Sequence, residues 1–231
     1  MEIGFDVIGD LFLSPNDEFN WEGKATSLYC IVTGNVGSDM GTLHKTLSHL
    51  TDHYKGILFV PGSYEFSDCD DFRQRNEDIN YVCKQLNVAS LWHHVVILEN
   101  IAIVGCNGWA DSEQFIDHVD ATTASELRYE DVIYLKNSIN KLQKHGDVNS
   151  IIIVTNSVPS KELYFGESPE YVDDQIPLDM CLNADTEHKV THWAFGSYGK
   201  AVDYKTNGIS YISNPYRNLE PYWPKRINTS I

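Results

Sequence analysis

The stretch "HWAFGSYGKAVDY", residues 192–204, shows how one buried strand of this chain ends. The run that closes at Phe195 is short, apolar and aromatic, as strands often are. It stops at a turn, residues 196–199, that contains two glycines. In an α/β protein, the turn at the carboxyl end of a strand is the usual place for binding or catalytic groups. This turn offers only a hydroxyl and a phenol, so its role depends on the other strand-end turns.

Strand-like and helix-like runs alternate along the rest of the chain. Further short runs rich in β-branched and aromatic residues lie at 2–8, 27–33, 56–62, 94–98, 101–106 and 150–155. Apolar residues at helical spacing lie between them, in two groups: Leu43, Leu47, Leu50 and Tyr54, then Val132, Leu135, Ile139 and Leu142. Aspartates in residues 67–72 mark a further helix start. This alternation predicts a layered α/β fold.

Two alternating runs, 201–206 and 209–215, flank Asn207-Gly208, a strong hairpin signal. A hairpin at this place predicts a mixed sheet rather than a purely parallel one. The chain of 231 residues has no internal repeat, low-complexity tract or Pro/Gly/Ser linker. We therefore expect a single domain over residues 1–231, with its loosest segments at 15–26 and 160–187.

The charge of the chain restricts its partners. The formal net charge is −16, from 33 acidic and 17 basic residues, so direct binding to a nucleic-acid backbone is disfavoured. Such acidity serves solubility, or it imitates a polyanion and attracts a basic partner. The first residues carry an acid where a signal peptide is basic, and no apolar run has the length of a membrane span. Five cysteines without a CxxC pair indicate reduced thiols. We expect a soluble, cytoplasmic protein without a membrane partner.

Five turns that follow predicted strands form a pattern: "GDLFLSP" (9–15), "TGNVGSD" (33–39), "VPGSYEF" (60–66), "VTNSVPS" (154–160) and "FGSYG" (195–199). In order and spacing they resemble the metal-binding turns of small, single-domain calcineurin-like metallophosphoesterases. Those turns read D-x-H, G-D, G-N-H-E, T-H-H and G-H-T-H. The segments "GCNGWAD" (105–111) and "VDYKTNGISYISNPYR" (202–217) are also similar to that family. The resemblance covers nearly the whole chain.

The resemblance implies a four-layer αββα sandwich, in which two mixed β-sheets lie face to face between helices. It also implies two divalent metals at the carboxyl ends of the central strands. Such a pair clamps a phosphate and activates a water, and carboxylates and imidazoles are suitable ligands. A histidine in the third turn assists the leaving group.

The residues at these family positions depart from the pattern. Asp10 keeps the aspartate of the first turn, but Phe12 stands at a ligand histidine and Asn35 at the bridging aspartate. In the third turn, Ser63 replaces the ligand asparagine and Tyr64 the catalytic histidine.

The remaining positions depart in the same way. Asn156 stands at the histidine of the fourth turn, and Ser197 and Gly199 stand at two histidines of the fifth. Of the eight positions, Asp10 alone is unchanged. Loss of every imidazole and of one carboxylate predicts no tight metal binding and no catalytic residue.

We expect no cofactor, or at most one weakly held Mg²⁺ or Mn²⁺ at Asp10, Asn35 and Glu65. Without metal, a buried Asp10 needs hydrogen bonds from turn N–H groups or hydroxyls, or a raised pKa. The donors expected are Tyr64, Ser197 and Tyr198. We also expect Phe12 and Tyr64 to occupy the space of metal and substrate.

The first functional hypothesis is therefore a pseudoenzyme that acts by binding a protein. Small members of this type occur in bacteria and their phages, so an inhibitor or regulator of a host protein is one form of this role. Side chains expected at the binding surface are Tyr64, Tyr198, Trp109 and Arg217. Two alternatives stay open: an active phosphoesterase with an oxygen-rich site, and a phosphate or nucleotide binder that uses turn N–H groups.

Overall fold

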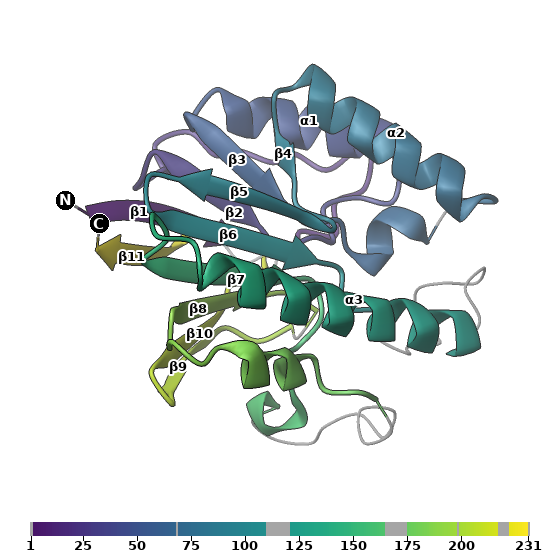
Figure 1. Ribbon diagram of the computed structural model, residues 1–231. Helices are drawn as coiled ribbons and strands as arrows, with labels where there is room; N and C mark the ends of the chain where they lie inside the picture. Colours follow the sequence, from purple (N-terminus) through teal and green to yellow (C-terminus); the bar gives the residue numbers. More distant parts are fainter. Residues whose placement is uncertain are drawn as a thin grey trace.

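The protein is described by a computed structural model, which covers residues 2–67, 69–109, 121–164, 175–197, 199–216 and 222–230 (Figure 1). The described residues form a five-stranded and a six-stranded β-sheet. The first sheet has the order β11-β1-β2-β3-β4, with β1 at Glu2–Ile8, β2 at Tyr29–Val32, β3 at Gly56–Phe59, β4 at Ala89–Ser90 and β11 at Lys225–Ser230. The second sheet has the order β5-β6-β7-β8-β10-β9, with β5 at His94–Leu98, β6 at Ile101–Cys106, β7 at Ser150–Thr155, β8 at Val190–Phe195, β9 at Val202–Thr206 and β10 at Ile209–Ser213.

Helices cover the outer face of each sheet. α1 (Met40–Thr51) and α2 (Phe72–Gln85) lie over the first sheet, and α3 (Ala121–Leu142) lies over the second (Figure 1). In the described part of the chain, the connections contain the short 3₁₀ helices η1 (Ser63–Phe66), η2 (Lys161–Leu163) and η4 (Leu178–Ala184). The predicted helix start is confirmed, because Asp71 accepts hydrogen bonds from the first N–H groups of α2.

Three apolar clusters define the layers. One lies between α1, α2 and the first sheet, and another lies between α3, η4 and the second sheet. The third lies between the two sheets and includes Phe5, Val7, Ile31, Ile103, Ile152 and Val154. The predicted four-layer αββα sandwich is therefore confirmed.

Both sheets are mixed, as predicted. β1, β2, β3 and β4 are parallel, and β11 is antiparallel to β1. In the second sheet β6, β7, β8 and β10 are parallel, while β5 and β9 form antiparallel edges. The hairpin between β9 and β10 is confirmed, and Asn207 and Gly208 both have the positive φ that its two-residue turn requires.

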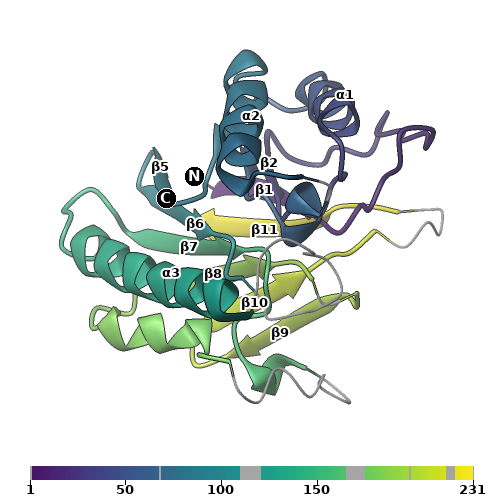
Figure 2. The same ribbon diagram turned by 90° about the vertical axis from the view of Figure 1, so that its right-hand side faces the viewer.

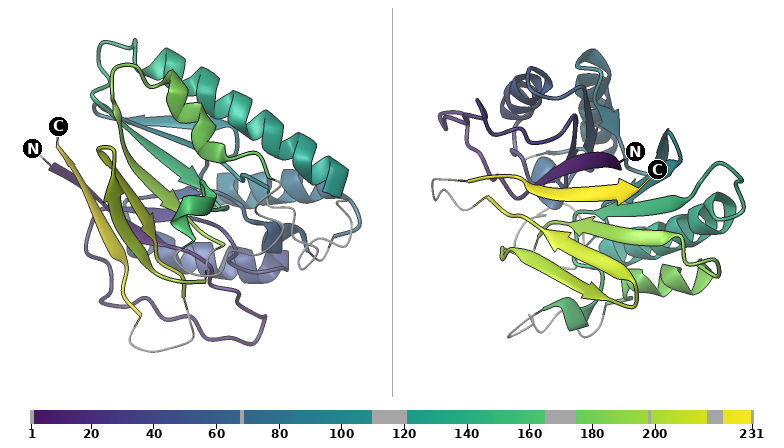
Figure 3. Two further views of the ribbon diagram at one scale, coloured as in Figure 1. Left: turned by 90° about the horizontal axis from the view of Figure 1, so that it is seen from below. Right: turned by 90° about the vertical axis from the view of Figure 1, so that its left-hand side faces the viewer.

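The strand β11 was not among the runs predicted from the sequence. It pairs antiparallel with β1, so the two ends of the chain lie side by side (Figure 3). Its inward positions carry Ile227 and Thr229, and its outward positions carry Arg226 and Asn228. Because Ile227 is its one large apolar residue, β11 lacks the apolar–polar alternation by which a strand is recognised in a sequence.

The parallel strands bring their carboxyl ends to one edge of the molecule, which faces the viewer in Figure 2. The five turns singled out in the sequence lie at this edge, which we call the strand-end edge. Within the described ranges, no helix has both the length and the apolarity needed to cross a bilayer.

Candidate functional site

The turns at the strand-end edge hold an unusual backbone. Asp10, Phe12, Asn35 and Ser197 have φ values of 51°, 47°, 55° and 55°. Positive φ is uncommon in residues other than glycine, and such residues cluster at ligand and active sites. These turns therefore share a backbone form that is frequent at functional sites.

The second and third turns approach each other too closely for a side chain. A Cβ atom on Gly34 would lie 2.6 Å from the backbone nitrogen of Gly62. A Cβ atom on Gly62 would lie 2.3 Å from Oδ1 of Asn35. The two glycines thus allow the backbones of neighbouring turns to meet.

Four polar side chains at this edge form one hydrogen-bonded group, which we call the polar network: Asp10, Asn35, Asn156 and Ser197. Nδ2 of Asn35 donates to Oδ1 of Asp10 at 2.9 Å and to Oγ of Ser197 at 3.0 Å. Oγ of Ser197 donates to Oδ1 of Asn156 at 2.9 Å, and its backbone N–H donates to Oδ1 of Asp10 at 2.9 Å. The structure therefore brings together residues from the first, second, fourth and fifth turns, as the sequence predicted.

The third turn joins the polar network through its backbone. Oδ1 of Asn35 accepts from the N–H of Tyr64 at 3.1 Å, and Oδ1 of Asn156 accepts from the N–H of Ser63 at 3.4 Å. Nδ2 of Asn156 donates to the carbonyl of Thr33 at 2.8 Å. The amide groups of both asparagines are thus engaged as donors and as acceptors.

These contacts test the expected donors to Asp10, which is 1% exposed. Ser197 is confirmed as a donor, through its N–H rather than its hydroxyl. Tyr64 instead donates its backbone N–H to Asn35, and Tyr198 lies outside the described residues. The donor role of Asn35 was missed, although an asparagine at the bridging position has the required amide.

Glu65 is fully buried and binds backbone rather than facing the polar network. Its Oε2 accepts from the N–H groups of Asn35 (3.0 Å) and Gly62 (2.5 Å). Its Oε1 accepts from those of Val36 (2.5 Å) and Gly37 (3.2 Å). Burial raises the pKa of Glu65 to about 7, and the four N–H donors oppose that rise. Glu65 therefore ties the second turn to the third, and both of its oxygens are engaged away from the expected metal position.

The two aromatic residues expected to fill the site lie at its rim. Phe12 is 37% exposed, and its ring meets the half-buried ring of Tyr64 edge-on, with centroids 5.1 Å apart. Hydrogen-bonded polar side chains fill the interior instead. Gly199 is exposed and brings no side-chain ligand.

The other expected binding residues do not form a surface in the described structure. Trp109 is 1% exposed and packs against the aromatic rings of Phe66, Phe72 and Trp92. It belongs to the core, so in this conformation it is no anchor for a partner. Arg217 lies outside the described residues.

The residues present do not fit the two metals that this type of fold can hold. The polar network has one carboxylate and no imidazole, and its amide and hydroxyl oxygens already accept hydrogen bonds. Among the described residues, no three His, Cys, Asp or Glu side chains are grouped so that they could hold a metal ion. Divalent metals at such sites need several anionic or imidazole ligands.

A second polar cluster, missed in the sequence, lies on the buried side of α3. Oδ1 of Asp131 contacts Nε2 of His93 at 2.5 Å, and its Oδ2 accepts from the N–H of Gly108 at 2.6 Å. Arg128 lies one turn earlier and is also buried. The sequence does carry a signal for this cluster, because Arg128 and Asp131 lie three residues apart, at helical spacing, among the apolar residues of α3.

No family model matches the chain, and no curated protein matches it in sequence. Solved structures do match. Phosphopantetheinyl hydrolase (PptH) from Mycobacterium tuberculosis is 14% identical with a TM-score of 0.67, covering 98% of this chain and 96% of that one. A Staphylococcus aureus protein assigned as a 5′-nucleotidase, in complex with alpha-ketoglutarate, is 10% identical with a TM-score of 0.62, covering 100% of this chain and 51% of that one.

GAP50 of Plasmodium, described as the anchor in the inner membrane complex, is 11% identical with a TM-score of 0.52. That match covers 93% of this chain and 71% of that one. At these identities the likeness concerns the fold. The chain therefore has the two-sheet αββα fold of the calcineurin-like metallophosphoesterases.

Proposed function

We propose that this chain is a non-catalytic protein of the metallophosphoesterase fold that acts by binding a protein partner at its strand-end edge. The observation that carries the proposal is the polar network. Asp10, Asn35, Asn156 and Ser197 stand at four ligand positions of the resembled family, and they bind one another. A metal would have to displace these hydrogen bonds, and those to Asp10 are charge-assisted, so each contributes about 1.5–3 kcal/mol.

The chemistry of phosphate ester hydrolysis supports the same proposal. Two metals in such a site activate a water and neutralise the charge that develops on the phosphate. Tyr64 stands where the resembled family has a histidine to protonate the leaving group, and a phenol is a weaker acid than an imidazolium. We derive no hydrolytic step from these residues.

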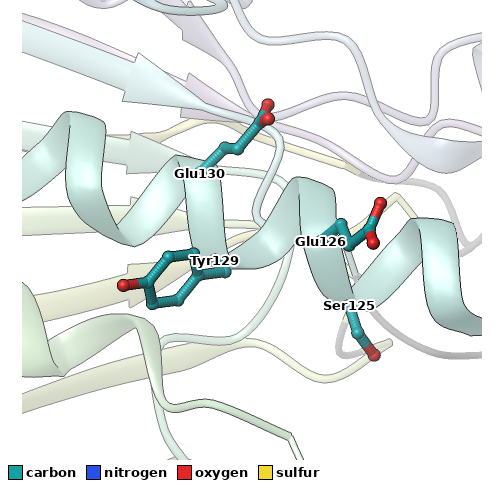
Figure 4. A pocket seen from close by; sticks show the side chains of 4 residues that line it. All are labelled: Ser125, Glu126, Tyr129 and Glu130. Atoms are coloured by element: carbon teal, nitrogen blue, oxygen red, sulfur yellow. The ribbon is translucent and has the colours of Figure 1, made fainter.

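The strand-end edge offers features of a binding surface. Phe12 and Tyr64 present a pair of partly exposed rings there. α3 begins at the same edge (Figure 1). Four of its side chains line an open hollow of about 570 Å³: Ser125, Glu126, Tyr129 and Glu130 (Figure 4). Exposed aromatics are frequent anchors at interfaces, and carboxylates beside them favour a partner with basic residues.

One structure with this fold supports a binding role by example. GAP50 of Plasmodium is described as an anchor, a role that requires attachment rather than turnover. Fold alone does not fix function. The residues of this chain therefore carry the proposal, and GAP50 shows only that a protein with this fold has been described as an anchor.

The protein-binding proposal predicts a selective loss of capture. Compared with the wild type, the double variant Phe12→Ala/Tyr64→Ala should capture at least about 10-fold less of a partner from cells that carry the protein, because two anchors are removed. Quantitative affinity capture with mass spectrometry measures this. Tyr81→Ala, which removes a 62% exposed ring from α2, is the matched control and should keep full capture. Equal capture by all three proteins would contradict the proposed surface.

A metal-dependent phosphoesterase is the second candidate. Asp10 favours this candidate, because it is the aspartate expected at this position of the resembled family and it has a left-handed backbone. This candidate requires turnover of a generic phosphodiester with Mn²⁺, Mg²⁺ or Zn²⁺ that Asp10→Ala abolishes. The third hypothesis, a phosphate held by turn N–H groups, gains less support. The N–H groups of residues 35–37 all donate to Glu65.

A further inference from the structure

Arg128 of α3 is a buried cation that ties two segments together. It is 5% exposed. Its Nε donates to the carbonyl of Ile176 at 2.6 Å, and its Nη1 donates to the carbonyls of Gly108 and Trp109. The guanidinium therefore links the turn after β6 to the segment that precedes η4. Its Nη2 makes no hydrogen bond within the described ranges of the chain.

This buried charge is held by carbonyl oxygens rather than by a carboxylate of the described residues. No carboxylate of the described residues lies within ion-pairing distance of Arg128. Carbonyl oxygens supply only partial negative charge, and burial lowers the pKa of Arg128 to about 10. This lowering of the pKa is opposed by Coulombic interactions with four more distant groups: Tyr164, Cys106, Asp131 and Asp179. Because a buried charge is costly unless it is paired, an anion brought to Arg128 would be stabilised.

A cavity of about 170 Å³ lies beside Arg128, and we call it the Arg128 cavity. Its lining residues are Arg128, Val158, Ser160, Lys161, Tyr164, Gln175 and Pro177. Nε2 of Gln175 is buried there without a hydrogen-bond partner in the part of the chain that the structure describes. A buried N–H donor without an acceptor costs about 1–3 kcal/mol of stability, so it favours a ligand that accepts.

We propose that the Arg128 cavity binds a small oxyanion, a phosphate or carboxylate group. The ligand receives charge from Arg128 and Lys161 and hydrogen bonds from Gln175 and the hydroxyl of Tyr164. Such groups match the chemistry of oxyanion recognition, in which guanidinium and ammonium donors bind charged oxygens. None of these residues belongs to the polar network, so the site is independent of the proposed function.

Two carboxylates near the cavity limit the anion that fits. Asp179 accepts a hydrogen bond from Ser160, and Glu162 follows Lys161. Burial raises the pKa of Asp179, and while ionised the two carboxylates repel a multiply charged anion more strongly than a singly charged one. A small anion with a single charged group therefore fits better than a polyanion.

The net charge of −16 makes the test stringent, because the chain as a whole repels anions. Inorganic phosphate and acetate are titrated separately into the full chain, with chloride at matched ionic strength, and binding is followed by calorimetry and by the unfolding temperature. We expect saturable binding of phosphate, acetate or both, and a chloride titration without saturation. The phosphate and acetate arms identify which group is preferred.

Variants assign the binding to this cavity. Gln175→Leu and Lys161→Met should each weaken the anion at least about 5-fold, because each removes a donor. Lys141→Met, which removes an exposed ammonium from the same helix α3, is the control and should bind as the wild type does. Arg128 itself is left unchanged, since its loss removes three carbonyl contacts and threatens folding. The proposal would be overturned if the wild type showed no saturable binding, or if both cavity variants bound the anion as tightly as the wild type does.

Discussion

Glu65→Gln should lower the free energy of unfolding by about 3 kcal/mol near pH 5. Each oxygen of Glu65 accepts two backbone N–H groups. Near pH 5 the protonated carboxyl still offers acceptor lone pairs on both oxygens, whereas glutamine places an NH₂ group at one of the two positions, so two buried N–H groups lose their acceptor and meet a donor. Urea unfolding followed by circular dichroism measures the change.

The pH dependence of this effect follows from the raised pKa of Glu65. The folded protein holds the proton up to about pH 7, while the ordinary value is 4.5. The unfolded chain therefore releases this proton first, and the stability contributed by Glu65 falls as the pH rises from about 4.5 to about 7. Glutamine does not titrate, so the gap between wild type and variant should be widest near pH 5 and narrow toward pH 8.

Glu130→Gln is the control for this prediction, because Glu130 is exposed on α3. Its unfolding free energy should stay within about 0.5 kcal/mol of the wild type, as for most surface changes. If Glu65→Gln also changed the free energy of unfolding by no more than about 0.5 kcal/mol at pH 5, Glu65 would not hold the second and third turns together.

Asn35→Asp should destabilise the protein by about 2–4 kcal/mol in metal-free buffer at neutral pH. Nδ2 of Asn35 lies 2.9 Å from Oδ1 of Asp10, so the substitution replaces a donor with a second carboxylate oxygen. Two carboxylates at this distance cannot both ionise without repulsion, so one pKa rises strongly. The hydrogen bond to Ser197 is also lost.

Divalent cations should reverse part of this loss, because paired carboxylates attract Mn²⁺ or Mg²⁺. Thermal unfolding of Asn35→Asp with and without millimolar Mn²⁺ measures the recovery. Asn137→Asp adds the same charge at an exposed position of α3 and should show neither the loss nor the recovery. If Asn35→Asp is as stable as the wild type in metal-free buffer, Asn35 is not held as a donor to Asp10.

The layers and the meeting of the strand-end turns at one edge could be predicted from the sequence, because both depend on local patterns. Strand runs carry β-branched and aromatic residues, and the turns that follow parallel strands must meet at one edge. Four residues that follow such strands are hydrogen-bonded to one another: Asp10, Asn35, Asn156 and Ser197. The strand β11 was not predicted from the sequence, because Ile227 is the one large apolar residue on its inward face.

The contacts at the site depend on segments far apart in the chain, and local patterns do not determine them. Glu65 was expected at a weak metal-binding site, but it accepts hydrogen bonds from the backbone N–H groups of Asn35 and Val36, some thirty residues earlier in the chain. Trp109 was expected at a surface, but rings from α2 and the segment before β5 enclose it. The roles of Tyr198 and Arg217, which lie outside the described residues, remain predictions.

We infer that hydrogen bonds within the chain, and not metals, hold the turns of the strand-end edge together. The most direct measurement is the unfolding temperature of the wild-type protein in EDTA and in millimolar Mn²⁺ or Zn²⁺, with elemental analysis of the purified protein. We predict unfolding temperatures equal to within about 1 °C and no stoichiometric metal, since ligands that do not bind cannot stabilise. A metal-dependent rise of about 5 °C or more, removed by EDTA and by Asp10→Ala, would contradict the claim.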